Sequence, residues 1–116
     1  ENEFLIRYES EVRAGNSPGH YPLSFGVTAQ ALGFSREQAL ESYCYGTVSG
    51  LVSAAVRLIP LGQTDGQRLI VSLEIAASGA VNEAMVRPLE AACSLGPGHE
   101  IRAMAHQRLY TRLFVS

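Results

Sequence analysis

The segment over residues 35–59 constrains the fold of this chain more than any other part of the sequence. It repeats apolar or weakly polar side chains at steps of three and four, at Leu40, Tyr43, Thr47, Leu51, Ala54 and Leu58. This period predicts an amphipathic α-helix of about six turns with one apolar stripe. Ser35 and Gln38 form the S-x-x-Q pattern of a capping box, which marks the start of a helix.

Small residues form a second stripe on the same segment. Gly46, Gly50 and Ala54 recur every four residues, a spacing that lets another backbone approach closely. We therefore expect a central helix that packs tightly against its neighbours. On this interpretation, the substitution Gly50→Leu unfolds the chain by overpacking the stripe.

The sequence RLIPLGQTDGQRLI, residues 57–70, interrupts the apolar pattern with two Gly, two Gln, one Pro and one Asp. Pro60 is expected to end the first long helix. Thr64 and Gln67 repeat the capping-box pattern, and the apolar residues after them predict a second long helix over residues 65–87. The interruption is interpreted as a rigid corner between two helices.

Shorter helices are predicted on both sides of this pair. They cover residues 3–13, residues 22–32 with Gly33 as the C-cap, a short piece that begins at Pro88, and a last piece that begins near Glu100. No segment shows the alternation of a β-strand for more than a few residues. The sequence therefore predicts an all-α fold, a compact bundle of five to six helices that forms one domain over residues 1–116.

Composition excludes several classes of function. The chain has 116 residues, 47% of them hydrophobic, and a net charge of −2 with no basic block, which argues against nucleic-acid binding. It has no run of 18 apolar residues and no signal-peptide pattern at its start, so no membrane contact is expected. Cys44 and Cys93 lie outside any ligand-spaced pattern and are expected to be reduced, buried residues of a cytoplasmic protein.

Candidates for catalysis or metal binding are few. The histidines His20, His99 and His106 are scattered, and none forms a metal-binding pair at helical spacing. Asp65, the only aspartate, has an ordinary structural role at a helix N-terminus. The sequence thus predicts no enzyme activity, no metal site and no cofactor. The alternative is a small helical metal-binding protein or hydrolase that uses His99, His106 and Cys93.

The C-terminal segment, residues 100–116, is both basic and apolar. It carries Arg102, Arg108 and Arg112 against a single acid, Glu100. Among them lie Ile101, Met104, Leu109, Tyr110, Leu113 and Phe114. Tyr, Phe and Arg are residue types that anchor interfaces. The residues alone leave two possibilities open, docking on the chain's own core and docking in a groove of another protein.

Three stretches resemble motifs of the urease accessory protein UreF family. They are GHYPLSFG, SAAVRLIPLGQTDGQRLI and EIRAMAHQRLYTRLFVS, which begin at Gly19, Ser53 and Glu100. The resemblance covers the chain from His20 onwards and only the C-terminal half of the family's usual length, because the family's N-terminal motif is missing. We therefore expect one half of a longer protein, with an apolar face exposed where further helices would pack.

The resemblance implies a non-catalytic, all-helical scaffold for urease maturation. Proteins of this family bind the accessory protein UreD, called UreH in some organisms, and the GTPase UreG, and they form dimers. Together they deliver nickel to apo-urease. Nickel is handled by that complex and is not expected as a tight ligand of this chain. The segment over residues 100–116 is implied to be the docking element for UreD/UreH.

Partner-binding residues carried over from the resemblance fall into two groups. The corner supplies Arg57, Pro60, Gln63, Asp65 and Gln67, and the C-terminal segment supplies His106, Tyr110, Arg112, Leu113, Phe114 and Ser116. Free N–H groups and amides at a helix junction make a polar surface suited to recognition. The alternative is that the corner residues only stabilise a tight turn. Ala105 and Val115 stand where the family usually has Arg, so the docking element lacks two charges.

Overall fold

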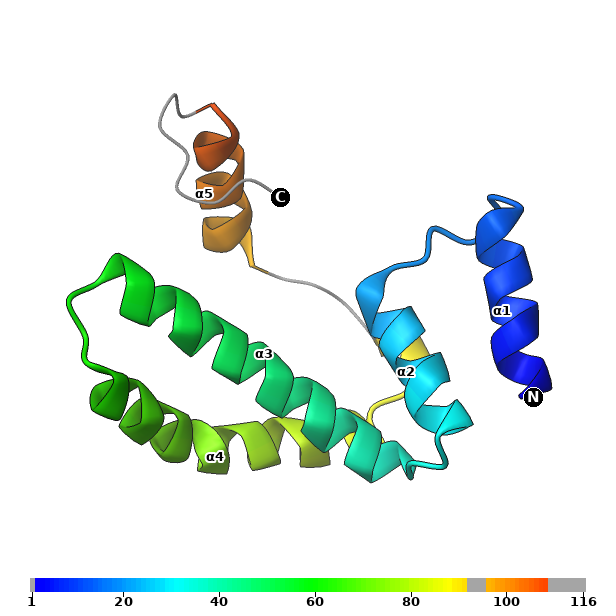
Figure 1. Cartoon of the computed structure of the whole chain (residues 1–116), viewed down its shortest axis with the longest axis horizontal. Coiled ribbons are helices and arrows are strands. Elements are labelled where there is room, and N and C mark those ends of the chain that lie inside the picture. The colour runs from blue at the N-terminus through cyan, green and yellow to red at the C-terminus, as the bar shows by residue number, and fades with distance from the viewer. Residues whose placement is uncertain (1, 92–95, 109–116) are drawn as a thin grey trace. The chain divides into compact units, whose positions relative to one another are not determined.

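The structure is a computed structural model that describes residues 2–91 and 96–108 (Figure 1). Within these residues the chain contains only helices and turns, so the all-α prediction is confirmed. The helices are α1 (Glu3–Arg13), α2 (Tyr21–Ala31), α3 (Arg36–Leu58), α4 (Gln63–Val86), the short 3-10 helix η1 (Leu89–Ala91) and α5 (Pro97–Gln107). The chain divides into two compact units, residues 1–86 and residues 87–116. The expectation of one domain stays a prediction.

Local backbone chemistry sets the junction between α2 and α3. Gly33 adopts a φ of +83°, and the N–H groups of Gly33 and Phe34 donate to the carbonyls of Gln30 and Ala29. This pair of bonds is a Schellman motif, and it confirms that Gly33 ends α2. The predicted capping box of α3 is also present. The Ser35 hydroxyl accepts a hydrogen bond from the N–H of Gln38, and the Gln38 side chain accepts one from the N–H of Ser35.

Helices α3 and α4 run antiparallel and form the long hairpin of the first unit (Figure 1). At one end, the Arg36 guanidinium of α3 donates to the carbonyls of Ala84 at 3.3 Å and Met85 at 2.5 Å. Near the middle, the Cys44 sulfur lies 4.0 Å from the carbonyl oxygen of Ala77. Residues further along α3 contact residues earlier in α4, as expected for an antiparallel pair. The two helices therefore face each other over most of their length.

Among the glycines of the hairpin, the one packed most closely against the other helix is Gly66, at the start of α4. A Cβ atom added to Gly66 would lie 2.9 Å from Val56 Cγ2, whereas one added to Gly46 or Gly50 would meet nothing within 4 Å. The prediction of a tightly packed small-residue stripe on α3 is therefore wrong. Leu51, on the predicted apolar stripe, is 63% exposed, so that stripe is not buried throughout. The register of the hairpin places the close contact on the other helix.

Two smaller contacts attach the first helices. The rings of Tyr21 and Phe25 from α2 cluster with Tyr43 of α3, with centroids 5.4–6.0 Å apart. The hydroxyl of Tyr8 in α1 lies 3.2 Å from the hydroxyl of Ser24 in α2. Aromatic packing of this kind adds about 0.5–1.5 kcal/mol per pair beyond area burial. These contacts join α1 and α2 to the N-terminal half of α3.

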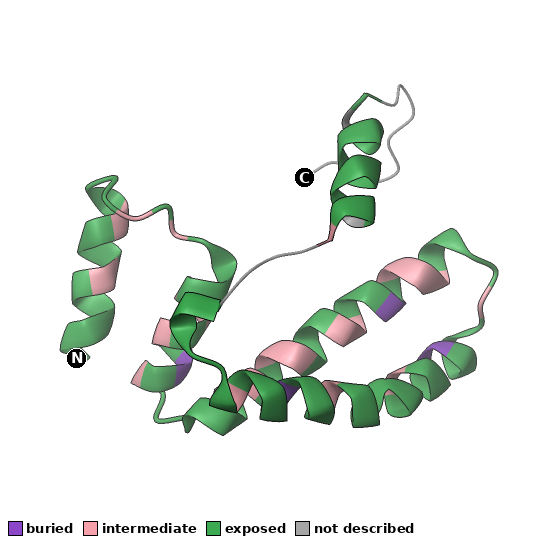
Figure 2. Ribbon diagram, turned by 180° about the vertical axis from the view of Figure 1, so that it is seen from behind, coloured by how far each residue is buried: buried purple, intermediate pink, exposed green. Residues whose placement is uncertain are grey.

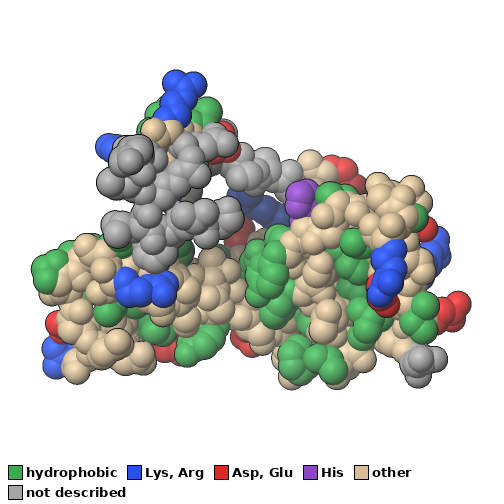
Figure 3. All heavy atoms as spheres, turned by 45° about the horizontal axis from the view of Figure 1, so that its top comes forward, with side chains coloured by type: hydrophobic (Ala, Val, Ile, Leu, Met, Phe, Trp, Pro, Cys, Tyr) green, Lys and Arg blue, Asp and Glu red, His purple; other side chains and the backbone are tan. Residues whose placement is uncertain are grey.

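Few apolar side chains of the described residues are removed from solvent. Ala29, Val52 and Val81 are the buried hydrophobic residues (Figure 2). Large apolar side chains remain at the surface on several helices, with Val71 68% exposed and Ile75 87% exposed, and apolar atoms emerge beside charged ones in the space-filling view (Figure 3). The exposed apolar surface expected from the sequence is therefore present.

Three predicted helix boundaries need correction. Helix α4 already begins at Gln63, because the N–H of Gly66 donates to the carbonyl of Gly62, so Thr64 lies inside the first turn and is not the N-cap of a capping box. The piece predicted to begin at Pro88 starts at Leu89 as the 3-10 helix Leu89–Ala91, and the rest of the predicted piece lies outside the described residues. Helix α5 begins at Pro97, because proline suits the first helical turn.

Helix α4 is, by length and composition alone, able to cross a membrane. Its most apolar window of 18 residues has a mean hydropathy of 1.4, and 6% of that window is buried. Polar residues such as Ser72 and Glu74 interrupt the helix, which is why a search for an unbroken apolar run overlooks it. One helix of this kind is weak support for a membrane span, since core helices of water-soluble proteins share this composition. The absence of membrane contact stays a prediction.

Candidate interaction site at the α3–α4 corner

The corner between α3 and α4 is a short, defined turn. Ile59 caps α3 in an extended conformation, with φ −121° and ψ 147°, as expected for a residue that precedes proline. Its N–H donates to the carbonyl of Ala55 at 2.8 Å, and the N–H of Leu61 donates back to the Ile59 carbonyl at 2.7 Å. Pro60 restricts the backbone between these bonds. The corner therefore presents neighbouring side chains in a restricted geometry.

Three of the predicted partner-binding residues converge beside this turn. Arg57 from α3 and Gln63 and Gln67 from α4 line one hollow of about 180 Å³. All three are exposed. The remainder of the lining comes from Val52, Ser53, Val56, Gly66 and Ile70. A guanidinium and two amides around an apolar floor can donate and accept several hydrogen bonds, but at neutral pH none of these groups serves as a nucleophile or a base.

Pro60 and Asp65 are exposed but do not line this hollow. The Asp65 carboxylate lies 3.3 Å from the Arg68 guanidinium, and the side chains are 53% and 77% exposed. Such a surface pair contributes little to stability. A carboxylate in the first turn of a helix interacts favourably with the positive end of the helix dipole. The contacts of Asp65 therefore match its structural interpretation, and its partner contact stays a prediction.

The predicted site residues of the C-terminal segment belong to the other unit. His106 is exposed in the last turn of α5. Tyr110, Arg112, Leu113, Phe114 and Ser116 lie outside the described residues. Their role in partner binding stays a prediction.

The described residues contain no cluster of three His, Cys, Asp or Glu side chains that could hold a metal ion. His99 and His106 are seven positions apart in α5, which separates them by about 10 Å along the helix axis. Cys93 lies outside the described residues. Cys44 is free and half-buried, not buried as expected. The residues named for the alternative of a metal-binding protein or hydrolase are therefore not brought together within the part of the chain that the structure describes.

The sequence places the chain in a known family. It matches the family model for UreF over residues 1–74. The chain belongs to the UreF family. The match to UreF begins at the first residue, whereas the sequence motifs indicated a resemblance only from His20 onwards. It includes the whole α3–α4 corner and ends before the predicted C-terminal docking element.

UreF proteins of several bacteria are similar over nearly the whole chain. The chain is 41% identical over 112 residues to the urease accessory protein UreF of Paenarthrobacter aurescens, which covers 97% of this chain and 50% of the relative. It is 38% identical to UreF of Bacillus sp. strain TB-90 and 33% identical to UreF of Haemophilus influenzae, with 49% and 48% of those relatives covered. The chain thus spans about half the length of the curated UreF relatives it matches.

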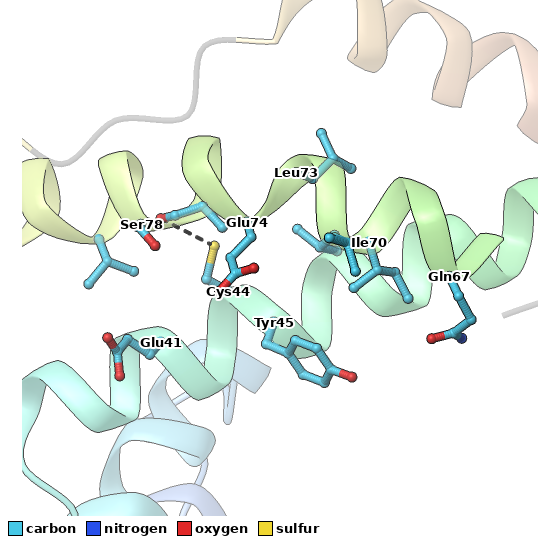
Figure 4. Close-up of a pocket in the computed structure, with 12 residues that line it drawn as sticks. Glu41, Cys44, Tyr45, Gln67, Ile70, Leu73, Glu74 and Ser78 are labelled. Carbon is cyan, nitrogen blue, oxygen red and sulfur yellow. Dashed lines mark hydrogen bonds between the residues drawn. The ribbon is translucent and has the colours of Figure 1, made fainter. Parts of the chain in front are cut away.

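A larger groove on the UreF hairpin was not predicted from the sequence. It has a volume of about 520 Å³ and is lined by residues of both helices, including Tyr45 of α3 and Leu73 of α4 (Figure 4). One signal for it was present. Val71, Leu73 and Ile75 follow Leu69 at every second position, so α4 carries apolar side chains on more than one face. A helix that is apolar on several faces needs more than one packing partner.

Proposed function

We propose that this UreF family member is a scaffold for urease maturation. It binds UreD/UreH and the GTPase UreG in a complex that supports nickel insertion into apo-urease. Two findings support the proposal. The chain belongs to the UreF family, and its relatives carry the name urease accessory protein. Scaffolding requires exposed, ordered contact surfaces and no reacting groups.

The observation that carries this proposal is the convergence of Arg57, Gln63 and Gln67 on one hollow beside a restricted turn. Residues held in place before binding lose less conformational entropy when a partner docks. The guanidinium suits a carboxylate or backbone carbonyls, and each amide can pair with a peptide group. The corner is therefore one contact surface of the scaffold, and the segment over residues 100–116 is the second, for UreD/UreH.

Nickel is the cargo of the complex in this proposal and not a tight ligand of the chain. The protein acts in the cytoplasm without enzymatic activity and as a homodimer. It makes no use of nucleic acid or membranes. The net charge of −2 agrees with the first of these exclusions, because nucleic-acid binding relies on clustered positive charge.

Co-purification tests the proposed contact at the corner. Tagged chain is mixed with UreD/UreH and separately with UreG, and the recovered partner is quantified. The double variant Arg57→Ala and Gln63→Ala is expected to lower recovery of at least one partner by tenfold or more, which corresponds to about 1.4 kcal/mol. Both side chains are exposed, so the fold should survive, and circular dichroism checks this.

The matched control changes an exposed Arg and an exposed Gln elsewhere on the same unit. Arg7 lies on α1 and Gln30 on α2, and neither lines the hollow. The double variant Arg7→Ala and Gln30→Ala is expected to recover both partners as the wild type does. Equal recovery by the corner variant and this control would contradict a partner contact at the corner.

A further inference from the structure

The groove between the middle parts of α3 and α4 is a feature of the first unit that the proposed function does not use. Its volume is about 520 Å³, and its lining includes Glu41 and Tyr45 of α3 and Leu73 and Glu74 of α4, which are labelled in Figure 4. Val48, Ile70, Val71, Ala77 and Val81 supply further apolar lining. The groove thus lies along the axis of an antiparallel helix pair.

The exposure of its apolar lining is unusual for a site that faces water. Tyr45 is 64% exposed, Val71 68% and Leu73 40%. Contiguous apolar surface of this kind marks an interaction site in a water-soluble protein. A third helix that packs into the groove between two others is the common way in which helical bundles cover such a surface.

The charges of the groove define the chemistry of the occupant. Two carboxylates, Glu41 and Glu74, line it, and no Arg, Lys or His does. Neither carboxylate has an ion-pair partner in the part of the chain that the structure describes. A helix that fills the groove therefore gains from basic side chains beside its apolar stripe, as in other cases of an amphipathic helix bound in a groove.

We propose that this groove binds an amphipathic helix from the region that the UreF relatives carry outside the matched 112 residues, with Arg or Lys side chains toward Glu41 and Glu74. That region is about as long as the matched segment of 112 residues, since the match covers 50% of the relative from Paenarthrobacter aurescens. The groove has an exposed apolar lining, and the first unit buries few apolar residues. Both observations are explained if a further apolar helix packs on this unit. The inference stands independently of any contact with UreD/UreH or UreG.

The test uses the full 116-residue chain and, as the probe, the remaining half of the Paenarthrobacter aurescens relative produced as a separate polypeptide. Binding is measured by calorimetry and by size-exclusion chromatography. We expect a one-to-one complex. Leu73→Glu is expected to weaken it at least tenfold, because the substitution puts a charge in the groove.

Matched controls separate the groove from apolar surface in general. Leu69 lies one turn away on α4, is 38% exposed where Leu73 is 40% exposed, and does not line the groove. Leu69→Glu is therefore expected to bind the probe within about threefold of wild type. On α3, Tyr45→Glu is expected to weaken binding, whereas Leu51→Glu, at nearly the same exposure, is not. All four side chains are partly exposed, which favours folding of every variant.

Each other result would overturn the proposal. These results are no binding of the probe, equal losses from Leu73→Glu and Leu69→Glu, and probe binding that Glu74→Arg leaves unchanged. Self-association of the chain that Leu73→Glu abolishes would assign the groove to a second copy. Binding of the chain to phosphatidylcholine vesicles that Leu73→Glu abolishes would assign it to a membrane.

Discussion

A Cβ atom on Gly66 would lie 2.9 Å from Cγ2 of Val56, a distance that real Cβ atoms do not reach. The absence of a side chain at this position lets the first turn of α4 lie directly against the last turns of α3. Gln63 and Gln67 flank Gly66 on the same turn and line the hollow at the corner. The close approach of the two helices therefore also positions the candidate contact residues.

Gly66→Leu is expected to destabilise the chain by about 1–3 kcal/mol, because overpacking forces the two helices apart. The measurement is urea unfolding followed by circular dichroism. Gly50→Leu is the control, since a Cβ there meets nothing within 4 Å and leucine favours a helix more than glycine does. Gly50→Leu should leave stability unchanged or slightly raised. Similar losses from both variants would contradict this packing of the hairpin.

Arg36→Ala is expected to lower stability by about 0.5–1.5 kcal/mol. The variant loses two hydrogen bonds to carbonyls in the last turn of α4, together with a positive charge beside that helix C-terminus. Part of the loss should disappear at high salt, because salt screens the interaction with the helix dipole. Arg7→Ala on α1, which has no comparable contact in the described residues, should change stability by less than about 0.5 kcal/mol. A loss no larger than that of Arg7→Ala would show that the hydrogen bonds carry no net stability.

Truncation after Gln107 is expected to reduce co-purification with UreD/UreH by tenfold or more while leaving the helical signal of residues 1–86 in place. The removed residues include Tyr110, Arg112 and Phe114, which are residue types that anchor interfaces. The intact chain is the reference in the same experiment. Equal recovery of UreD/UreH by both chains would remove the docking role of this segment.

Nickel titration of the purified chain is expected to show no tight one-to-one binding. The physical reason is the donor arrangement, since the described residues contain no cluster of three metal-ligating side chains. His99→Ala should leave the calorimetric curve unchanged. Tight stoichiometric binding that His99→Ala abolishes would instead support the alternative of a small metal-binding protein.

Sequence patterns predicted the helices well wherever local contacts decide the structure. The capping box at Ser35 and the Schellman glycine Gly33 mark helix ends through hydrogen bonds within a few residues, so they can be read without a tertiary structure. The capping pattern at Thr64 did not mark a helix start. Helix α4 begins at Gln63, and the N–H of Gly66 already donates to the carbonyl of Gly62.

The candidate site was predictable only in part. The resemblance of the stretch around Pro60 to a UreF motif indicated Arg57, Gln63 and Gln67 as contact residues, and the structure brings these three together. It does not bring Asp65 to the same hollow, because that carboxylate lies toward Arg68. The groove beside Tyr45 was missed, because periodicity assigns one apolar face to a helix and cannot show which second face lies in a groove.

The helical content of this chain, the positions of most helix ends and the resemblance to UreF could all be predicted from the order of its residues. That the close contact falls on Gly66 and not on Gly50, and that the groove lined by Glu41 and Glu74 opens between α3 and α4, became evident only from the packing of the two helices. The reason is physical. Helix formation depends on neighbours along the chain, whereas packing depends on the register of two helices whose facing residues lie up to about fifty positions apart.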